Sequence, residues 1–358
     1  MKKIAIITLP GYFNFGNRLQ NYALQHALEE KGTQVITLFP VRKIRTMKEF
    51  LWNFVERRNG KLCLRYFKDI EKECKLWSFT KDRILTRKIK TENGKIPNFV
   101  NEQYDCFVVG SDQVWNPNFW DQSQDSYEYF NYMLKFADSQ KRIAYAASFG
   151  VSDLPEFWKK PFSDSLDQFE YISVREKAGK QLVEQLSNKA ATVCIDPTML
   201  LTAEQWRSIE QTPKRKEKYI LTYMLGDLDE TVGTEIEQYA REQSLKIVHI
   251  TDIKGKQYAI RPEEFLGYID NAQVVVTDSF HACVFSILFH TPFLVTSRKY
   301  KNKMNMNSRT VHLLESFGLE KQVYHAEGLS EKCDFSSVDL RLASLRKESE
   351  KFLEKIIT

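Results

Sequence analysis

The stretch TDSFH, residues 277–281, places an aspartate, a serine and a histidine where an apolar run of valines gives way to an apolar helical pattern. The valines predict a buried strand and the residues after the histidine predict a helix. Asp278 or Ser279 is expected to cap that helix. His281 then lies in its first turn, where the helix dipole lowers the pKa of an imidazole. That position suits an acid or base, and it suits a packing residue equally well.

Two further polar segments follow predicted strands directly. The loop Gly11–Asn17 offers glycine backbone and a helix start, which favour anions or sugar oxygens, although a simple turn explains it as well. The stretch VVGSDQVWNP combines the hydrogen-bonding groups of Asp112 and Gln113 with the flat ring of Trp115. That mixture of groups suits sugar binding. The alternative interpretation is that Ser111 or Asp112 caps the helix that follows.

Two arginines are candidates for binding an anion. Arg175 ends a predicted strand in SVREKAG, and Arg309 lies in a polar loop that leads into a helix. A guanidinium offers a planar fork to a carboxylate or a phosphate. An ion pair of Arg175 with Glu176 or Asp196 is the alternative interpretation.

Several common catalytic patterns are absent from the sequence. There is no HExxH, GxSxG or Walker A motif, and the first loop is not a GxGxxG fingerprint, so metal-dependent hydrolysis, ATP hydrolysis and NAD binding find no support. The six cysteines form no CxxC pair, which indicates reduced thiols that pack as small apolar side chains.

The elements that must position these residues alternate between strand and helix. This alternation predicts a doubly wound α/β fold in two domains, 1–195 and 196–358, that face a cleft. Residues 41–100 differ, because they carry helical spacing with many charges and aromatics. We expect a helical insertion there with basic helices, although a solvated helical face explains the charges as well. The basic residues concerned are Arg42, Lys43, Arg45, Arg57 and Arg58.

Net charge and hydropathy limit the ligands and the cellular location that we expect for this chain. The chain of 358 residues has 52 basic and 47 acidic side chains, and the net charge of +5 is too small to argue for nucleic acid. It fits an enzyme with anionic substrates, or contact with an anionic membrane surface. The apolar run Ile4–Leu9 is too short for a signal peptide, and no window approaches a membrane span. We therefore expect a cytoplasmic protein, at the inner face of the membrane if it contacts lipid.

The order of these segments resembles the polysaccharide pyruvyl transferase family over most of the chain, from about Ile4 to Leu319. Many relatives carry a basic residue between the serine and the histidine, in a Ser-Arg-x-His arrangement, whereas Phe280 stands between Ser279 and His281 in this chain. Arg309 or Arg175 is expected to replace it. The segments that carry the resemblance are NFGNRLQNYALQHAL, DCFVVGSDQVWNP, RIAYAASFG, YISVREKAG, CIDPTMLL, VVVTDSFHACVFSILFHTPFLV and NMNSRTVHLLESFGL.

The resemblance implies a fold similar to the two-domain GT-B glycosyltransferases, with phosphoenolpyruvate as donor and no metal or organic cofactor. It implies an acceptor sugar in a cell-surface polysaccharide, such as a capsule or exopolysaccharide, or in its lipid-linked precursor. The product is a cyclic pyruvate ketal. We expect His281 to be the catalytic acid or base, Arg175, Ser279 and Arg309 to bind the donor, and the acceptor side to be formed by Asn17, Asp112, Gln113 and Trp115.

Two other functions fit the same sequence. A nucleotide-sugar glycosyltransferase shares the two-domain architecture, and it would release UDP from its donor. A glycan-binding protein without catalysis would keep its function when His281 is replaced by alanine. Incubation with phosphoenolpyruvate distinguishes the glycosyltransferase from ketal formation, because phosphate release that depends on the acceptor supports the ketal and UDP release supports glycosyl transfer.

Overall fold

The structure is a computed structural model that describes residues 1–11, 14–41, 55–58, 61–298, 308–325 and 328–358.

The first half of the chain folds around a seven-stranded parallel sheet in the order β5-β2-β1-β6-β7-β8-β9. Its inner strands are continuous apolar runs, as expected for strands with helices on both faces. The strands are β1 (Lys3–Ile7), β2 (Gln34–Val41), β5 (Thr86–Lys90), β6 (Cys106–Val109), β7 (Arg142–Ala147), β8 (Tyr171–Val174) and β9 (Ala191–Val193). The α-helices of this half are α1 (Phe15–Glu29), α3 (Phe67–Arg83), α4 (Tyr127–Tyr132), α5 (Glu156–Leu166) and α6 (Lys177–Leu186), with 3₁₀ turns η1 (Asn98–Gln103), η2 (Pro117–Phe119) and η3 (Ser139–Lys141).

The second half builds a four-stranded parallel sheet in the order β11-β10-β12-β13. Its strands are β10 (Tyr219–Tyr223), β11 (Lys246–His249), β12 (Val274–Thr277) and β13 (Phe293–Val295). Its helices are α8 (Glu230–Glu242), α9 (Pro262–Asp270), α10 (Phe280–Phe289), α11 (Ser308–Phe317) and α12 (Val338–Ile357), with η5 (Glu320–Gln322) and η6 (Gly328–Ser330); η4 (Pro197–Met199) and α7 (Ala203–Arg207) connect the halves. The prediction of two α/β units is confirmed.

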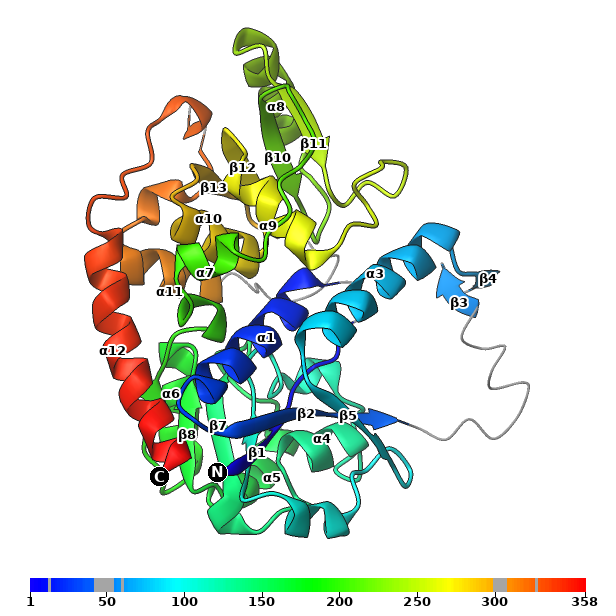
Figure 1. The fold of residues 1–358 in the computed structure, drawn as a ribbon, viewed down its shortest axis with the longest axis vertical. Coiled ribbons are helices and arrows are strands. Elements are labelled where there is room, and N and C mark those ends of the chain that lie inside the picture. The colour runs from blue at the N-terminus through cyan, green and yellow to red at the C-terminus, as the bar shows by residue number, and fades with distance from the viewer. Residues whose placement is uncertain (12–13, 42–54, 59–60, 299–307, 326–327) are drawn as a thin grey trace.

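Parallel pairing fixes where loops can meet. Every strand pair of the two main sheets is parallel, so all carboxyl ends of one sheet lie along the same edge. Within the first sheet the connections leave β1 toward β2 on one side and meet β6 on the other, which makes a topological switch point. Figure 1 shows the two units facing one another, with α1 between them. The helix α10 is buried along all ten residues, and no helix among the described residues is long and apolar enough to cross a bilayer.

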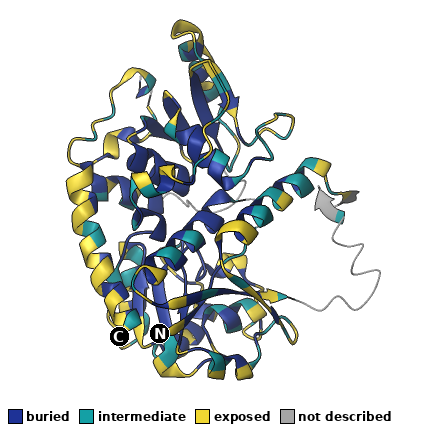
Figure 2. Cartoon of the chain, in the orientation of Figure 1, coloured by how far each residue is buried: buried dark blue, intermediate teal, exposed yellow. Residues whose placement is uncertain are grey.

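The last helix, α12, packs against the first unit as well as the second. Figure 1 shows α12 (red) running from the upper unit down beside the lower one, so that the two termini lie close together. Its residues Phe352, Leu353 and Ile356 pack in one cluster with Ile4 and Ile6 of the central strand. Figure 2 shows the outer side of α12 exposed and its inner side buried. A boundary that assigns 196–358 to the second domain is therefore wrong for the C-terminal helix.

The region 41–100 differs from the expected helical insertion. It contains the helix α3, but also the antiparallel hairpin of β3 (Val55–Arg58) and β4 (Lys61–Leu64), and β5, which joins the main sheet beside β2. Arg57 and Arg58 lie on a strand, so their place in a basic helix was wrong. Local charge and spacing do not reveal that β3 pairs with its neighbour β4 in a hairpin, or that β5 pairs with the distant strand β2. The other basic residues of this prediction, Arg42, Lys43 and Arg45, lie outside the described residues.

The helix α3 bridges the two units. Tyr258 donates a hydrogen bond of 2.5 Å to Asp69, and Arg261 of the second half binds Ser78 and Asp82 on α3 at 2.6 and 2.9 Å. The units are thus joined by contacts of the insertion as well as by α12, and the edges that carry the polar loops are held opposite one another.

Candidate active site

Polar residues from both sheets meet at the carboxyl edges of their strands. Asp112 follows β6, Arg175 follows β8 and Asp196 follows β9, while His281 lies in the first turn of α10 after β12. Arg309 is the second residue of α11. All five side chains are buried, with at most 7% of their surface exposed. Burial of this many charged groups is costly unless each has a partner, so the contacts among them define the site.

Asp196 is the centre of the network. Its Oδ2 accepts a hydrogen bond of 2.6 Å from Nη1 of Arg175, and Oδ1 accepts bonds from the backbone and hydroxyl of Thr198. Nε2 of His281 lies 3.6 Å from the same Oδ2, too long for a hydrogen bond but close enough for ionic attraction. Burial by itself would raise the pKa of Asp196, but His281 and Arg175 outweigh it and hold that pKa well below its usual range. Asp196 is therefore a fixed negative charge beside the histidine.

Asp112 forms the second anionic contact. Its backbone φ is 68°, a left-handed conformation that aspartate tolerates better than most residues. The carboxylate accepts a hydrogen bond from Nδ2 of Asn17, which brings α1 of the first unit into the site. Nη2 of Arg175 lies 3.6 Å from Oδ1, and Nη1 of Arg309 lies 3.9 Å from the same atom. Asp112 thus holds both guanidinium groups in one place.

Besides Asp112, both arginines lie next to the ring of Phe280. Cζ of Arg175 lies 4.4 Å from the centre of the Phe280 ring, and Cζ of Arg309 lies 5.7 Å from it. Burial opposes the charge on Arg175, but Asp196, Asp112 and Glu176 together raise its pKa. For Arg309, burial and then the charge of Arg175 lower the pKa to about 10. Of the two arginines, Arg309 is therefore the one whose positive charge is neutralised less by neighbouring carboxylates.

Donor groups in the site are left without hydrogen bonds. Among the described residues, Nε and Nη2 of Arg175, Nε of Arg309 and Nε2 of His281 are buried and have no hydrogen-bond partner. Buried donors of this kind are uncommon in folded proteins, and each costs free energy until a partner arrives. A ligand with several anionic oxygens would satisfy all of them at once.

Two helix N-termini meet at His281. A Cβ atom added to Gly16, the second residue of α1, would lie 2.0 Å from Nδ1 of His281. The start of α1 therefore packs directly on the imidazole at the start of α10, and only glycine leaves room for this approach. Each helix start carries a partial positive charge and free N–H groups. The two dipoles add to the guanidinium groups in favouring an anion here.

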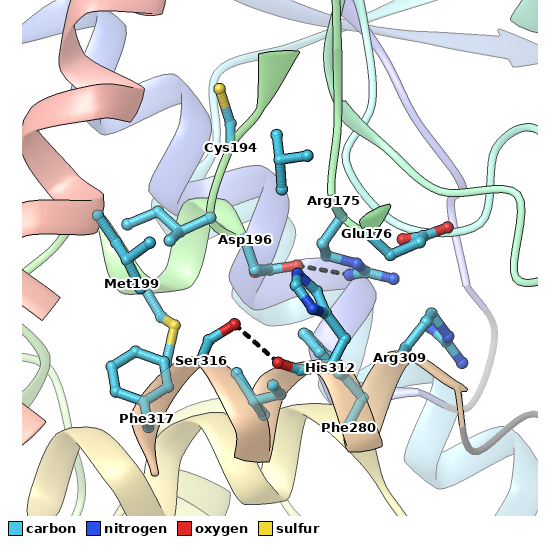
Figure 3. A pocket seen from close by; sticks show the side chains of 14 residues that line it. Arg175, Glu176, Cys194, Asp196, Met199, Phe280, Arg309, His312, Ser316 and Phe317 are labelled. Atoms are coloured by element: carbon cyan, nitrogen blue, oxygen red, sulfur yellow. Dashed lines mark hydrogen bonds and ion pairs between the residues drawn. The ribbon is translucent and has the colours of Figure 1, made fainter. Parts of the chain in front are cut away.

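A cavity with a volume of about 50 Å³ opens beside this network. Figure 3 shows Arg175 and Asp196 joined across it, with Arg309 and Phe280 on one side. His312, on α11, also lines the cavity, and burial followed by the charge of Lys177 lowers its pKa. The mixture of two cations with apolar walls suits a small organic anion.

Some of the predicted site residues lie together in the structure. Arg175, Arg309, His281, Asp112 and Asn17, which come from distant parts of the sequence, form one connected set. The pair between Arg175 and Asp196 forms as well, so that alternative interpretation is also correct.

One acceptor-side prediction does not hold. Trp115 is fully buried, its Nε1 donates to the carbonyl of Tyr132, and its ring packs on Phe149 and Phe169, so it is a core residue rather than a plate for stacking a sugar. Gln113 is buried, as Asn17 is, and its Oε1 accepts a hydrogen bond from Asn116, so its place on the acceptor side stays a prediction. The segment leads into a 3₁₀ turn that begins at Pro117 rather than an α-helix, so Asp112 does not cap a helix there.

The capping prediction for α10 is wrong as well. Ser279 occupies the N-cap position without a side-chain hydrogen bond to the helix, and it is 1% exposed. Asp278 instead accepts bonds from the backbone N–H groups of Leu225 and Gly226 and from Arg298. These contacts fix the strand end to a neighbouring loop. They leave the first N–H groups of α10 uncapped by Asp278 or Ser279.

Sequence reasoning missed three contributors to the site: Asp196, Glu176 and His312. Asp196 and Glu176 were considered only as partners of Arg175. Glu176 binds the hydroxyl of Ser148 and two backbone N–H groups of the β7–α5 loop through Oε1. Asp196 follows a strand, as the chosen residues do, so the same criterion would have found it. Nothing in the local sequence distinguishes His312, because only the tertiary fold brings it to the site. Gly16 lies in the loop Gly11–Asn17 that the sequence singled out, but its contact with His281 comes from the tertiary fold.

Within the described part of the chain, no group of three or more His, Cys, Asp or Glu side chains is placed to hold a metal ion.

Comparison with known proteins identifies relatives. A family model described as polysaccharide pyruvyl transferase matches residues 14–300. No curated protein sequence matches the chain. Among solved structures, a putative UDP-N-acetylglucosamine 2-epimerase from Listeria monocytogenes is similar at a TM-score of 0.51 and 12% identity, covering 99% of this chain and 91% of that one. A glycosyltransferase from Streptomyces sp. SF2575, SsfS6, has a TM-score of 0.44 and 12% identity over the full length of both chains. The first likeness supports the two-unit α/β fold and, at this identity, nothing finer.

Proposed function

Because the chain belongs to the polysaccharide pyruvyl transferase family, we propose that it transfers pyruvate from phosphoenolpyruvate to a sugar of a polysaccharide or of its lipid-linked precursor. The product is a cyclic ketal, and phosphate is released. One structural observation supports the proposal independently of the family match. Two buried guanidinium groups with unpaired N–H donors lie beside a histidine where two helices begin.

The donor is a small anion with a carboxylate and a phosphate. Arg175 and Arg309 are assigned to these two groups, because their unpaired N–H donors are close together and charge-assisted hydrogen bonds are the strong ones. Asp112 keeps the two guanidinium groups side by side despite their repulsion. The N-termini of α1 and α10 add partial positive charge to the same place.

His281 is assigned the proton transfer. The methylene carbon of phosphoenolpyruvate takes a proton from His281, which leaves an oxocarbenium-like centre at the adjacent carbon. One sugar hydroxyl attacks that carbon, and a second hydroxyl then displaces phosphate. Of the two hydroxyl protons, one restores the proton given by His281 and the other leaves with phosphate, so the atoms balance. Asp196, 3.6 Å from Nε2, stabilises the charged imidazole before the transfer.

Asn17 and Asp112 are assigned to the acceptor hydroxyls. Asp112 lies between Asn17 on one side and the two arginines on the other, so a hydroxyl bound there is adjacent to the donor. Holding both reactants in one geometry removes much of the entropic cost of their encounter.

The test is the identity of the products. The protein is incubated with phosphoenolpyruvate and a panel of glycans and lipid-linked glycan mimics, and the sugars are analysed by mass spectrometry. We expect a mass gain equal to pyruvic acid less one water, with phosphate release that depends on the acceptor. Release of UDP from UDP-sugars, with no reaction of phosphoenolpyruvate, would instead identify a nucleotide-sugar glycosyltransferase and refute the proposal.

A further inference from the structure

The cavity beside Arg175 contains an unpaired acceptor as well as unpaired donors. Among the described residues, Oε2 of Glu176 is buried without a hydrogen-bond partner, and the whole residue is 3% exposed. Arg175 and Arg309, with their unpaired N–H donors, line the same cavity. A buried acceptor without a partner costs free energy, as a buried donor does. A ligand that satisfies this cavity must therefore accept hydrogen bonds from the arginines and also donate one.

The carboxylate of Glu176 is held in a fixed orientation. Its Oε1 accepts hydrogen bonds from the hydroxyl of Ser148 at 2.9 Å and from the N–H groups of Phe149 and Gly150 at 3.0 and 3.3 Å. All three donors belong to the loop that follows β7, so this loop occupies Oε1. Figure 3 shows the carboxylate and the guanidinium group of Arg309 at the same end of the cavity. Oε2 is therefore left for a partner other than the loop.

Glu176 also acts on the charges of the groups around it. Burial acts to lower the pKa of Arg175, Arg309 and His312, and it is the largest influence on each. The negative charge of Glu176 acts in the opposite direction on all three of these pKa values. The carboxylate therefore belongs to the same electrostatic environment as the two arginines, and a ligand bound by them interacts with it as well.

A carboxylate beside two arginines selects among anions. It repels an anion whose oxygens are all unprotonated, whereas a protonated oxygen donates a hydrogen bond to it. At neutral pH a phosphate ion carries at least one proton, and sulfate carries none. The two ions are both tetrahedral and similar in size, so the proton is the property by which a carboxylate distinguishes them.

The size of the cavity agrees with one such group. Its volume is about 50 Å³. One water molecule needs about 10–15 Å³ of such volume, so the cavity has room for roughly three or four waters. The four oxygens of one tetrahedral anion occupy a comparable space.

We propose that Glu176 makes this cavity specific for a phosphate group that carries a proton. Arg175 and Arg309 donate to the unprotonated oxygens, and the P–OH group donates to Oε2 of Glu176. Sulfate is rejected, because it has no proton to donate and leaves Oε2 unpaired. The assignment of this phosphate to the donor substrate rests on the proposed function, whereas the preference for phosphate over sulfate does not.

The proton also assists the transfer proposed above. When the second sugar hydroxyl forms its bond to the donor carbon, the bond from that carbon to the bridging oxygen of the phosphate breaks, and its electron pair goes to that oxygen. A phosphate that already carries the proton leaves as HPO₄²⁻, which is a better leaving group than PO₄³⁻. The proton of the attacking hydroxyl then converts HPO₄²⁻ to H₂PO₄⁻, so the atoms balance.

Calorimetry with sodium phosphate and with sodium sulfate, at neutral pH and equal ionic strength, measures the preference directly. We expect phosphate to bind the natural protein more tightly than sulfate by about tenfold or more, because an unpaired buried acceptor is costly. In Glu176→Gln the amide oxygen keeps the three donors of the loop, and the amide NH₂ group replaces Oε2 with a donor. Sulfate should then bind as tightly as phosphate does.

Glu210→Gln is the matched control. Oε2 of Glu210 is also buried without a hydrogen-bond partner within the described part of the chain, but Glu210 does not line this cavity. The variant should therefore keep the preference of the natural protein for phosphate.

Three results would overturn the proposal: no binding of phosphate, equal binding of phosphate and sulfate by the natural protein, or a preference for phosphate that persists in Glu176→Gln. Equal binding of the two anions would indicate that a water molecule satisfies Oε2 of Glu176. The comparison on the natural protein needs no variant, so it decides the proposal even if Glu176→Gln does not fold.

Calorimetry with phosphoenolpyruvate, run in parallel, separates this proposal from the proposed function. A preference for phosphate that depends on Glu176, without any binding of phosphoenolpyruvate, would refute the proposed function and leave this site standing. Binding of phosphoenolpyruvate together with equal affinities for phosphate and sulfate would refute the role of Glu176 alone.

Discussion

Replacing Arg309 by methionine should stabilise the protein and disable donor binding at the same time. The side chain is 7% exposed, and burial together with Arg175 lowers its pKa from 12.5 to about 10. Each tenfold change in proton affinity corresponds to about 1.4 kcal/mol, so keeping Arg309 charged in the folded protein costs roughly 3 kcal/mol. Methionine fills similar space beside Phe280 without the charge, so up to this amount is regained.

The same substitution removes a charge-assisted contact to the donor. Such contacts contribute about 1.5–3 kcal/mol, so we expect the affinity for phosphoenolpyruvate to fall by roughly 10- to 150-fold. Calorimetry measures the affinity, and thermal unfolding without ligand measures the stability. A higher midpoint together with weaker binding is the expected pair of results. Loss of function with gain of stability is the signature of a residue kept for its ligand rather than for the fold.

Arg346→Met is the matched control. Arg346 is half-buried, and it donates to the carbonyls of Met199 and Leu201 at 2.6 and 2.7 Å. Its loss should lower the unfolding midpoint and leave phosphoenolpyruvate binding unchanged. The reasoning is refuted if Arg309→Met lowers the midpoint as Arg346→Met does while the donor still binds with its original affinity.

The other predictions concern the histidine and its carboxylate. His281→Gln should reduce kcat for acceptor-dependent phosphate release by about 10²-fold or more, whereas His312→Gln should cost less than tenfold; similar losses in both would contradict the assigned role. Gly16→Ala should displace His281, since its Cβ would lie 2.0 Å from the ring, and lower kcat; Gly233→Ala, with its nearest neighbour at 3.6 Å, should not. The pKa of Asp196 is held below its unfolded value near 3.9, so it stabilises the fold above about pH 4 and that stabilisation is lost as the pH falls further. Unfolding midpoints of Asp196→Asn should therefore be lower at pH 7 and decline less steeply in acid; a decline parallel to the natural protein would count against this account.

The strand-end criterion found most of the site because parallel sheets bring their carboxyl ends together. Arg175 and His281 were both chosen as polar residues at the end of an apolar run, and both contact Asp196. The same criterion failed for Trp115, because a local pattern does not reveal whether a ring points to solvent or to the core. The ring is enclosed by Phe149 and Phe169, which come from residues much later in the chain.

The segment 41–100 illustrates the same limit at the level of elements. Its charges and spacing favour helix, and α3 is indeed helical. The strand β5 has the exposed, basic sequence TRKIK, which has little intrinsic preference for a sheet. It becomes a strand because the edge of β2 offers a parallel partner over five residue pairs, a contact that only the folded sheet supplies.

The sequence by itself determined the alternation of buried strands and amphipathic helices, the polar residues at the strand ends, and the resemblance that names the family. These follow from periodicity and composition, which are local properties of a chain. The tertiary structure alone decided that Gly16 packs on His281, that Asp112 holds two arginines together, and that α12 returns to the first sheet. Those contacts join residues distant in sequence, and the electrostatics of a buried site depend on the distances between its charges rather than on their order along the chain.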